Sequence, residues 1–461
     1  MSAPPTAPGS PVDEAAEHLL DELAARFAAA RPASAALHRR AGEVLPGGNT
    51  RTPLFHEPYP TYLVSGQGSR VVDADGLEYV DLVNNYTSLV HGHPSGQATT
   101  ELADRARAGT ALGAPTPLEV ELAAELVERI GSVERVRFVN SGTEAVLYAV
   151  RTARAYTGRD DVVKAEGGYH GGAESMQVSV KSLGVDGAGV VEAGVPGAVA
   201  ASTHVVPFND AQAAQAEIRR LGDRLAAVVV EPVQGGAGAL PAEPEYLQAL
   251  RRASEEVGAL LVFDEVMTLR LDHGGMQSAY GVRPDLTAMG KIIGGGLPVG
   301  AFGGRAEVMD VWDPRASRPL YHAGTFNGNP VTMVAGLRSL RELTAERIAA
   351  INATGDRLRG FIDERARHHR VPVTASGIGS VLQVHSGHQP PRSFRDAATR
   401  SKTLVRCLHL LLLEHGVFTA PRGAMNISTA LTPGDLTVVE EAIEASLRQV
   451  AAALTDARVT G

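Results

Sequence analysis

Asp264 and Lys291 are the residues of this sequence whose types and spacing are best suited to chemistry. Asp264 ends the apolar run ALLVFDEV, and Lys291 follows 27 residues later in the glycine-rich stretch GKIIGGGLPVGAFGG. A carboxylate at the end of a buried parallel strand faces the crevice where α/β sheets bind ligands. An enclosed lysine loses solvation, so its pKa falls and its amine becomes nucleophilic. The alternatives are a capping or ion-paired aspartate and a surface lysine on a flexible loop.

The stretch VRFVNSGTEAVLYAV indicates a phosphate site, because it reads as strand, turn and helix. Ser141, Gly142 and Thr143 stand at the helix N-terminus, where free N–H groups and the helix dipole attract anions. Serine followed three residues later by glutamate also fits an ordinary capping box. Thr325 in HAGTFNGNP is a second possible phosphate ligand. The P-loop pattern is excluded, since Ile292, and not serine or threonine, follows the lysine.

Three further side chains could reach the same crevice. Tyr169 in EGGYHGG could stack on a flat ring, and Glu231 and Gln234 follow the strand AAVVV in EPVQGGAG. Together these pieces meet the needs of pyridoxal 5'-phosphate: a lysine for a Schiff base, a carboxylate for the ring nitrogen, a phosphate cup and a stacking aromatic. The lysine would also move a proton between carbons as general acid and base.

Composition narrows the class of protein. The chain has 461 residues, 44% apolar and 21% charged, which is typical of a globular protein with two or three domain-sized units. A net charge of -9 argues against binding to nucleic acid or to an anionic membrane. No apolar run is long enough to span a bilayer, and the N-terminus lacks a signal-peptide pattern, so a cytoplasmic location is expected.

A metal centre is not expected. The single cysteine, Cys407, excludes an internal disulfide and a cysteine-cluster metal site. His91 and His93 in HGHP have no cysteine or carboxylate near them in the sequence, so they are interpreted as loop histidines.

The elements that must position these residues alternate along the chain. Helices are expected at 14–30, 33–44, 118–130, 143–156, 211–221, 244–257, 333–343, 345–367, 397–415 and 433–455. Strands are expected within 61–84 and at 136–139, 161–165, 226–232, 259–266 and 283–290. Apolar runs between helices predict an α/β fold with a mostly parallel sheet covered by helices on both faces.

Four segments are expected. Residues 1–12 are predicted to be a disordered tail, and 13–90 an N-terminal segment of helices and small strands. Residues 91–335 are predicted to form the large cofactor-binding domain. Residues 336–461 are predicted to form a smaller α+β domain, which the N-terminal segment joins.

The order SGTEA, GGYHGG, EPVQG, FDEV, GKIIGGGLPVGAFGG and GTFNGNP resembles the class III aminotransferases, which have pyridoxal-phosphate fold type I. The resemblance covers roughly residues 35–455. Within that class the chain is most similar to bacterial β-amino-acid aminotransferases, such as (S)-β-phenylalanine aminotransferases, and to glutamate-1-semialdehyde aminomutases. The pieces PGGNTRTPLFHEPYP, FDEVMT and PRGAM carry the similarity to the former.

The resemblance implies roles around the cofactor. Lys291 would carry the Schiff base and Asp264 would pair with the pyridine nitrogen. Tyr169 would stack on the ring, Val266 would pack on its other face, and Gln234 would lie near the ring hydroxyl. Ser141, Gly142 and Thr143 would hold the phosphate, together with the partner's Thr325. The resemblance therefore also implies a homodimer with shared active sites.

The resemblance also implies substrates, a small-molecule amino donor and a 2-oxo acid acceptor. Arg51 in NTRTP would bind a substrate carboxylate, and Tyr86 is a further expected substrate-binding residue. Arg422 in PRGAM would bind the carboxylate of the acceptor. The polar Asn426 and Thr429, which stand where β-phenylalanine enzymes have an apolar run, leave room for an aliphatic or polar β-amino acid. The alternative function is an aminomutase, which has no second substrate.

Overall fold

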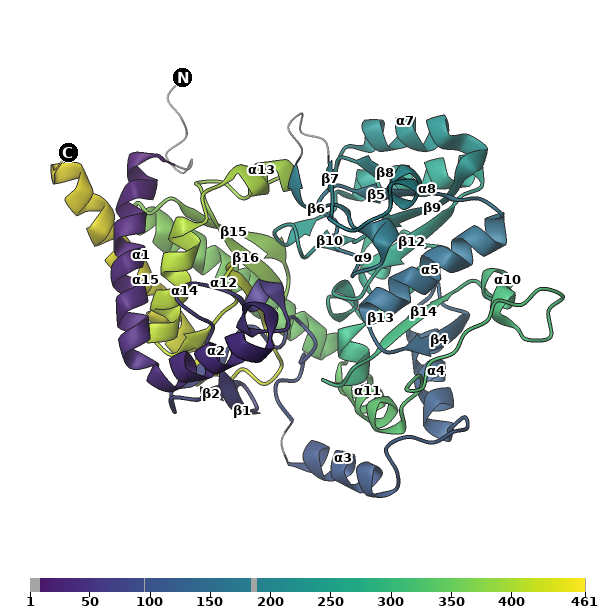
Figure 1. The fold of residues 1–461 in the computed structure, drawn as a ribbon, viewed down its shortest axis with the longest axis horizontal. Coiled ribbons are helices and arrows are strands. Elements are labelled where there is room, and N and C mark those ends of the chain that lie inside the picture. Colours follow the sequence, from purple (N-terminus) through teal and green to yellow (C-terminus); the bar gives the residue numbers. More distant parts are fainter. Residues whose placement is uncertain (1–8, 95, 184–188, 461) are drawn as a thin grey trace.

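A seven-stranded sheet forms the centre of the protein in the computed structural model, which describes residues 9–94, 96–183 and 189–460 (Figure 1). Its strands lie in the order β4 (Arg135–Val139), β14 (Gly300–Gly304), β13 (Leu286–Gly290), β12 (Leu260–Asp264), β9 (Leu225–Val230), β5 (Asp161–Ala165) and β8 (Thr203–Val206). Six of these seven run parallel, and β14 runs antiparallel between β13 and β4. The predicted mostly parallel α/β sheet is therefore confirmed.

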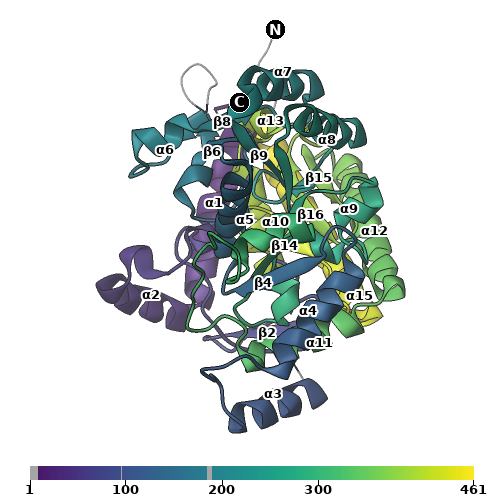
Figure 2. The same cartoon turned by 90° about the vertical axis from the view of Figure 1, so that its right-hand side faces the viewer.

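Strand β14 was not predicted, because GAFGG carries no β-branched residue and reads as loop. Figure 2 shows β4 and β14 at the near side of the sheet. A Cβ atom added at Gly300 would collide with the carbonyl group of Ser141, at the start of helix α5 (Gly142–Thr157). Glycine is therefore needed here so that the strand and the helix start can approach closely.

Helices cover both faces of the sheet because alternate residues of its strands point to opposite sides. Val228, Val230, Leu261 and Phe263 pack in one cluster with helices α7 (Ala211–Leu221) and α8 (Pro244–Val257). The residues between them, such as Val229 and Val262, pack in a second cluster with α5. The predicted bounds of α7 and α8 are confirmed to the residue.

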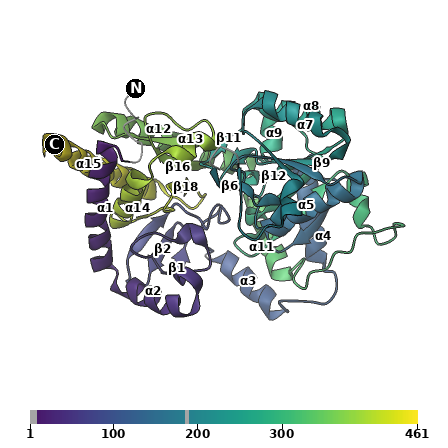
Figure 3. The ribbon, with the colours of Figure 1, turned by 45° about the horizontal axis from the view of Figure 1, so that its top comes forward.

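The N-terminal and C-terminal parts of the chain pack together beside the central sheet. Figure 3 shows α1 (Pro11–Ala30) next to α14 (Thr403–Glu414) and α15 (Pro433–Thr460). The strands here form two sheets: β1 (Leu63–Gln67), β2 (Arg70–Asp73), β3 (Glu78–Asp81) and β17 (Val417–Phe418); and β15 (Val373–Ile378), β16 (Val381–Ser386) and β18 (Ala424–Asn426). The first sheet joins chain segments from both ends, since β17 pairs with β3.

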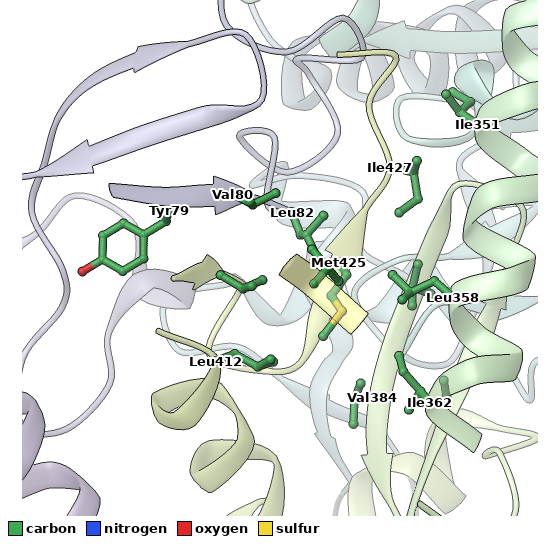
Figure 4. Packing of buried hydrophobic residues seen from close by; sticks show 14 of the residues in the cluster. Tyr79, Val80, Leu82, Ile351, Leu358, Ile362, Val384, Leu412, Met425 and Ile427 are labelled. Carbon is green, nitrogen blue, oxygen red and sulfur yellow. The ribbon is translucent and has the colours of Figure 1, made fainter. Parts of the chain in front are cut away.

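Side chains from both ends also share one apolar core (Figure 4). Leu82, which follows β3, lies beside Met425 of β18, and Leu358 and Ile362 of helix α12 (Ala345–His369) cover them. The core therefore fixes the end of β3 against β18, which matters for the site described below. The predicted domain boundaries at residues 90 and 335 stay a prediction.

The remaining elements are short or peripheral. They are α2 (Pro32–Val44), α3 (Gln97–Arg107), α4 (Pro117–Arg129), α6 (Gly197–Ala201), α9 (Met276–Tyr280), α10 (Ala306–Met309), α11 (Pro330–Glu342), α13 (Phe394–Thr399), β6 (Val178–Leu183), β7 (Gly189–Val191), β10 (Val233–Gln234) and β11 (Leu240–Pro241). Within the described residues, no helix is long and apolar enough to cross a membrane.

Two sequence predictions are wrong in detail. The single helix expected at 397–415 is split into α13 and α14, because Arg400 adopts an extended conformation. The tail expected to be disordered ends earlier than residue 12, since α1 begins at Pro11 with Ser10 as its N-cap. Residues 1–8 of that tail lie outside the described residues.

Candidate active site

Lys291 lies at the end of strand β13, where the chain leaves the sheet in a short 3-10 turn, Lys291–Gly294. Its φ of 50° is left-handed, a conformation that residues with side chains adopt rarely and mostly at functional sites. Burial lowers the pKa of Lys291, while the charges of Asp264 and Glu231 oppose that shift. The lysine is therefore in an enclosed site and not on a surface loop, which suits its amine to nucleophilic attack.

Asp264 ends strand β12, next to β13, and shares a hydrogen bond with His170. The distance from His170 Nδ1 to Asp264 Oδ2 is 2.8 Å, and the backbone N–H of Val266 donates to Oδ1 at 3.1 Å. Burial lowers the pKa of His170, so its ring is neutral near neutral pH and donates from Nδ1 to the carboxylate. No role was predicted for His170, although it stands beside Tyr169 in EGGYHGG.

Glu231 is buried directly after strand β9 and holds the backbone of the aromatic residue. Its Oε1 accepts a hydrogen bond from the N–H of Tyr169 at 2.8 Å, and its Oε2 accepts one from Gly235 at 3.1 Å. Burial, and then the charge of Asp264, raise the pKa of Glu231. The ring of Tyr169 stays 53% exposed, so it presents a free face on the side of the site open to solvent.

Lys164 on strand β5 is a residue that sequence reasoning missed, although a lysine inside the apolar run DVVKA is a signal. Its ammonium group donates to three backbone carbonyls, those of Gly168 at 2.8 Å, Met176 at 2.9 Å and Val178 at 2.9 Å. Burial lowers the pKa of Lys164 to about 7, and the charge of Glu231 opposes the shift. Because three acceptors match its three protons, Lys164 fixes the loop that carries Tyr169 and His170.

The residues predicted to bind the phosphate stand at the start of helix α5. The side chain of Ser141 caps α5 by accepting from the N–H of Glu144 at 3.1 Å, so the capping alternative holds for that hydroxyl. The N–H groups of Gly142 and Thr143 stand in the first turn, where a helix offers them no acceptor. The hydroxyl of Thr143 accepts from the N–H of Gly172 at 3.1 Å.

Thr325 stands apart from that helix start. It is exposed, and within the described residues it makes no hydrogen bond to Ser141, Gly142 or Thr143. Its neighbour Asn327 is tethered to the end of β4, since Asn140 Nδ2 donates to Asn327 Oδ1 at 2.8 Å.

Arg51 and Arg422 both lie close to the ring of Tyr86. Their guanidinium carbons are 5.9 Å and 5.7 Å from the ring centroid, respectively. Arg51 donates to the side chain of Asn85 at 2.8 Å, and the buried Nε of Arg422 has no partner within the described residues. Burial lowers the pKa of Arg422 and raises that of Tyr86. Three residues predicted to bind substrate therefore lie together, and neither arginine forms an ion pair with a carboxylate of the described residues.

A sequence model of the family Aminotransferase class-III matches residues 55–454. The chain belongs to the class III aminotransferases. This family moves amino groups between small-molecule donors and 2-oxo acids, has fold type I, and uses pyridoxal 5'-phosphate, which is therefore the cofactor of this enzyme.

Three relatives of this class III aminotransferase illustrate its place in the family. The glutamate-1-semialdehyde 2,1-aminomutase 2 of Anoxybacillus flavithermus is 41% identical over 425 residues, 91% of this chain and 97% of the relative. The β-phenylalanine transaminase of Variovorax paradoxus is 40% identical over 423 residues, 92% of this chain and 94% of the relative. The crystal structure of an ω-transaminase from Sphaerobacter thermophilus has a TM-score of 0.86 at 44% identity, covering 92% of this chain and 98% of that one.

The residues of this class III aminotransferase fit its cofactor. Gln234 is buried and donates to the carbonyl of Glu166 at 2.8 Å, which leaves its Oε1 without a partner and free for a ring hydroxyl. A Cβ atom at Gly142 would come within 2.9 Å of Val266, so glycine lets the start of α5 lie close to that side chain. Lys291, Asp264 and the N-terminus of α5 then supply the amine, carboxylate and anion site that the group requires.

The histidines of HGHP have structural partners in this enzyme. His91 contacts the hydroxyl of Thr429 at 2.8 Å, and His93 contacts the carboxylate of Asp81 at 3.0 Å. The sequence analysis found no carboxylate near these histidines, but the fold places Asp81 next to His93. In the described part of the chain, no group of three or more His, Cys, Asp or Glu residues is arranged to hold a metal ion.

Proposed function

We propose that this enzyme moves the amino group of a β-amino acid, of the β-phenylalanine type or an aliphatic 3-amino acid, to a 2-oxo acid such as 2-oxoglutarate or pyruvate. The observation that carries the proposal is the pair of arginines beside Tyr86, which lack a carboxylate partner in the described chain. A guanidinium fork is complementary to a carboxylate. Arg51 binds the carboxylate of the donor and Arg422 that of the acceptor, so the two half-reactions of the ping-pong mechanism use different arginines.

The chain's own groups divide the chemical work. The cofactor, when bound, supplies a ring that accepts the electron pair released at the substrate carbon. Lys291 takes the proton from that carbon and returns it elsewhere, and the burial that lowers its pKa favours this exchange. Asp264 holds a proton on the ring nitrogen, and His170 holds Asp264. Tyr169 and Val266 confine the ring between them.

The polar residues near the C-terminus do not argue for a polar substrate. Asn426 Nδ2 donates to the carbonyl of Val83 at 3.0 Å, and the hydroxyl of Thr429 is bound to His91. Since both groups are used inside the protein, they leave the substrate side chain free to be apolar.

A homodimer with shared active sites belongs to the same proposal. Thr325 lies between two exposed aromatic residues, Tyr321 at 81% and Phe326 at 59% exposure. Exposed aromatic side chains of this size are common at subunit interfaces. We expect this segment to reach the phosphate site of a second copy, where Thr325 donates a hydrogen bond. Light scattering of the purified enzyme measures the dimer directly, and a monomer would contradict it.

The second candidate is a glutamate-1-semialdehyde 2,1-aminomutase. The aminomutase relative, at 41% identity, supports it about as strongly as the β-phenylalanine transaminase, at 40%, supports the first candidate. An aminomutase exchanges groups within one molecule, so it has no need of Arg422 as an acceptor site. Aminomutases have a segment of the GTLSGNP type at this place, whereas this chain has GTFNGNP, which argues against this candidate.

A panel of amino donors tests the proposal. The yellow pyridoxal form of the enzyme is mixed in single turnover with β-phenylalanine, β-aminobutyrate, β-leucine, β-alanine, glutamate and glutamate 1-semialdehyde. Bleaching to the pyridoxamine form by at least one β-amino acid, and recovery of the colour with a 2-oxo acid, are expected. Bleaching only by glutamate 1-semialdehyde would support the aminomutase, and bleaching only by α-amino acids would contradict both candidates. Lys291→Ala is the inactive control.

A further inference from the structure

The turn that carries Tyr86 has an unusual backbone. Four consecutive residues without glycine, Asn84, Asn85, Tyr86 and Thr87, have φ angles of 49°, 45°, 55° and 75°. Asparagine tolerates this left-handed conformation, but tyrosine and threonine do so poorly. One left-handed turn is closed by the N–H of Tyr86, which donates to the carbonyl of Val83 at 2.9 Å. Such a turn persists only where its surroundings hold it.

Two buried asparagines hold this turn against strand β18. Asn84 Nδ2 donates to the backbone carbonyl of Asn426 at 2.7 Å, and Asn426 Nδ2 donates back to the carbonyl of Val83 at 3.0 Å. The backbone N–H of Asn426 also donates to the carbonyl of Leu82 at 2.6 Å. Both side chains are nearly inaccessible, at 0% and 4% exposure, so water cannot replace these hydrogen bonds without opening the core.

The turn is connected to both substrate-binding arginines, to Arg51 by a hydrogen bond and to Arg422 through strand β18. Asn85, the second residue of the turn, accepts from Arg51 at 2.8 Å. Arg422 stands two residues before β18, the strand that ends in Asn426. The turn is therefore attached to Arg51 on one side and, through Asn84 and Asn426, to the strand after Arg422 on the other.

We propose that Asn84 and Asn426 are positioning residues that set the spacing of the two carboxylate-binding arginines around Tyr86. This inference rests on the proposed function, because it assigns the arginines to substrate carboxylates. Lys291 directly follows β13 and Asp264 ends β12, and neither belongs to this network. Loss of the asparagine pair therefore weakens recognition of a carboxylate and leaves the chemistry at Lys291 intact.

Two probes of the holoenzyme separate these effects. Aminooxyacetate and hydroxylamine both attack the cofactor and remove its yellow colour, but only aminooxyacetate carries a carboxylate. Its nitrogen and carboxylate have the same spacing as in a β-amino acid. The ratio of their second-order rate constants therefore measures carboxylate recognition alone, independent of turnover.

The variants are Asn84→Gly and Asn426→Ala. Glycine keeps the left-handed backbone accessible and removes only the side-chain hydrogen bond, so it is the cleaner change. We expect the ratio to fall roughly ten-fold in each, as for the loss of one buried hydrogen bond, with the hydroxylamine rate unchanged. Asn84→Asp replaces the amide that donates to the carbonyl of Asn426 by a carboxylate, which cannot donate. It serves as a second variant if Asn426→Ala does not fold.

Asn209→Gly is the matched control. Asn209 is also left-handed, at a φ of 64°, and its Nδ2 also donates to a backbone carbonyl, that of Pro241 at 3.1 Å. It precedes helix α7, away from the arginines, so its ratio should stay at the wild-type value.

The outcomes separate this inference from the function on which it rests. A wild-type enzyme without preference for aminooxyacetate would overturn the carboxylate site and this inference with it. A wild-type preference that Asn84→Gly and Asn84→Asp retain would overturn the positioning role alone. Equal loss of both rates would assign the asparagines to general stability and would also overturn it.

Discussion

His170 donates from Nδ1 to the carboxylate of Asp264 over 2.8 Å, although 94 residues separate the two in the sequence. Strand order explains the contact, because β5, which precedes the loop of His170, and β12, which carries Asp264, flank β9. The neutral ring gives the carboxylate a fixed orientation and leaves its negative charge for the cofactor nitrogen. His170 is thus a positioning residue, and its effect can be measured.

Replacement of His170 by phenylalanine should lower kcat roughly 10- to 100-fold, the range found when a partner that orients a functional ligand is lost. His170→Asn, which keeps a donor, should recover part of this loss. Spectra of the bound cofactor across pH give the readout that general destabilisation would not change. His204→Phe on strand β8 is the control, since His204 pairs with Asp161 away from the site. Unaltered kcat in His170→Phe would refute the role.

Replacement of Arg422 by lysine keeps the charge and removes the planar fork. We expect KM for the 2-oxo acid to rise roughly ten-fold, because one charge-assisted hydrogen bond is lost. KM for the donor should change less, since Arg51 stays in place. Steady-state kinetics with both substrates varied separates the two constants. Equal rises in both would show that the arginines do not serve separate substrates.

Replacement of Lys164 by methionine removes the three hydrogen bonds that fix the loop of Tyr169. The carbonyl groups of Gly168, Met176 and Val178 would be left buried without a donor, at a cost of about 3 kcal/mol of unfolding free energy. Urea unfolding of the holoenzyme measures this loss. Lys402→Met is the matched control, because Lys402 is exposed. If Lys164→Met loses no more unfolding free energy than Lys402→Met, Lys164 does not fix the loop of Tyr169.

Stability should fall on acidification. Burial lowers the pKa of His385 to about 4 and that of His56 to about 4. Between about pH 6.5 and pH 4 the unfolded chain binds protons that these folded histidines do not, so unfolding becomes easier as pH falls. Each histidine lowers the free energy of unfolding by up to about 3 kcal/mol as the pH falls through that window, and has no such effect above it.

The variant His385→Gln tests this sign. Unfolding free energy is measured in urea at about pH 5 and about pH 7.5, and the difference between the two should shrink relative to wild type. The exposed His368 gives the control variant His368→Gln, whose difference should stay the same. Stability that rises on acidification would contradict the assignment.

The sequence was sufficient for some features and not for others, for physical reasons. Buried Val- and Leu-rich runs predict β9 and β12 because their burial on both faces leaves a composition signal. Strand β14 has none, since its glycines fit close contacts with the neighbouring backbone, such as that of Gly300 with Ser141, and not strand propensity. The contact between His170 and Asp264, and the Asn84–Asn426 pair, depend on strand order and on packing between chain ends, which no local pattern encodes.

Polar residues are harder to interpret where their partners are distant in the sequence. Asn426 and Thr429 left room for an aliphatic or polar substrate, and their side chains bind Val83 and His91. A buried polar residue is usually satisfied by the protein itself, and its partner cannot be found from neighbouring letters.

The central claim is that Lys291 is the amine to which the cofactor is bonded. The sequence has four lysines: Lys164, Lys181, Lys291 and Lys402. Borohydride reduction of the holoenzyme, followed by peptide mass spectrometry, makes the bond permanent and locates it. The account predicts the cofactor mass on the peptide that contains Lys291 and on no other, and none in Lys291→Ala. A label on the buried Lys164, or an enzyme that reduction leaves unlabelled, would contradict it.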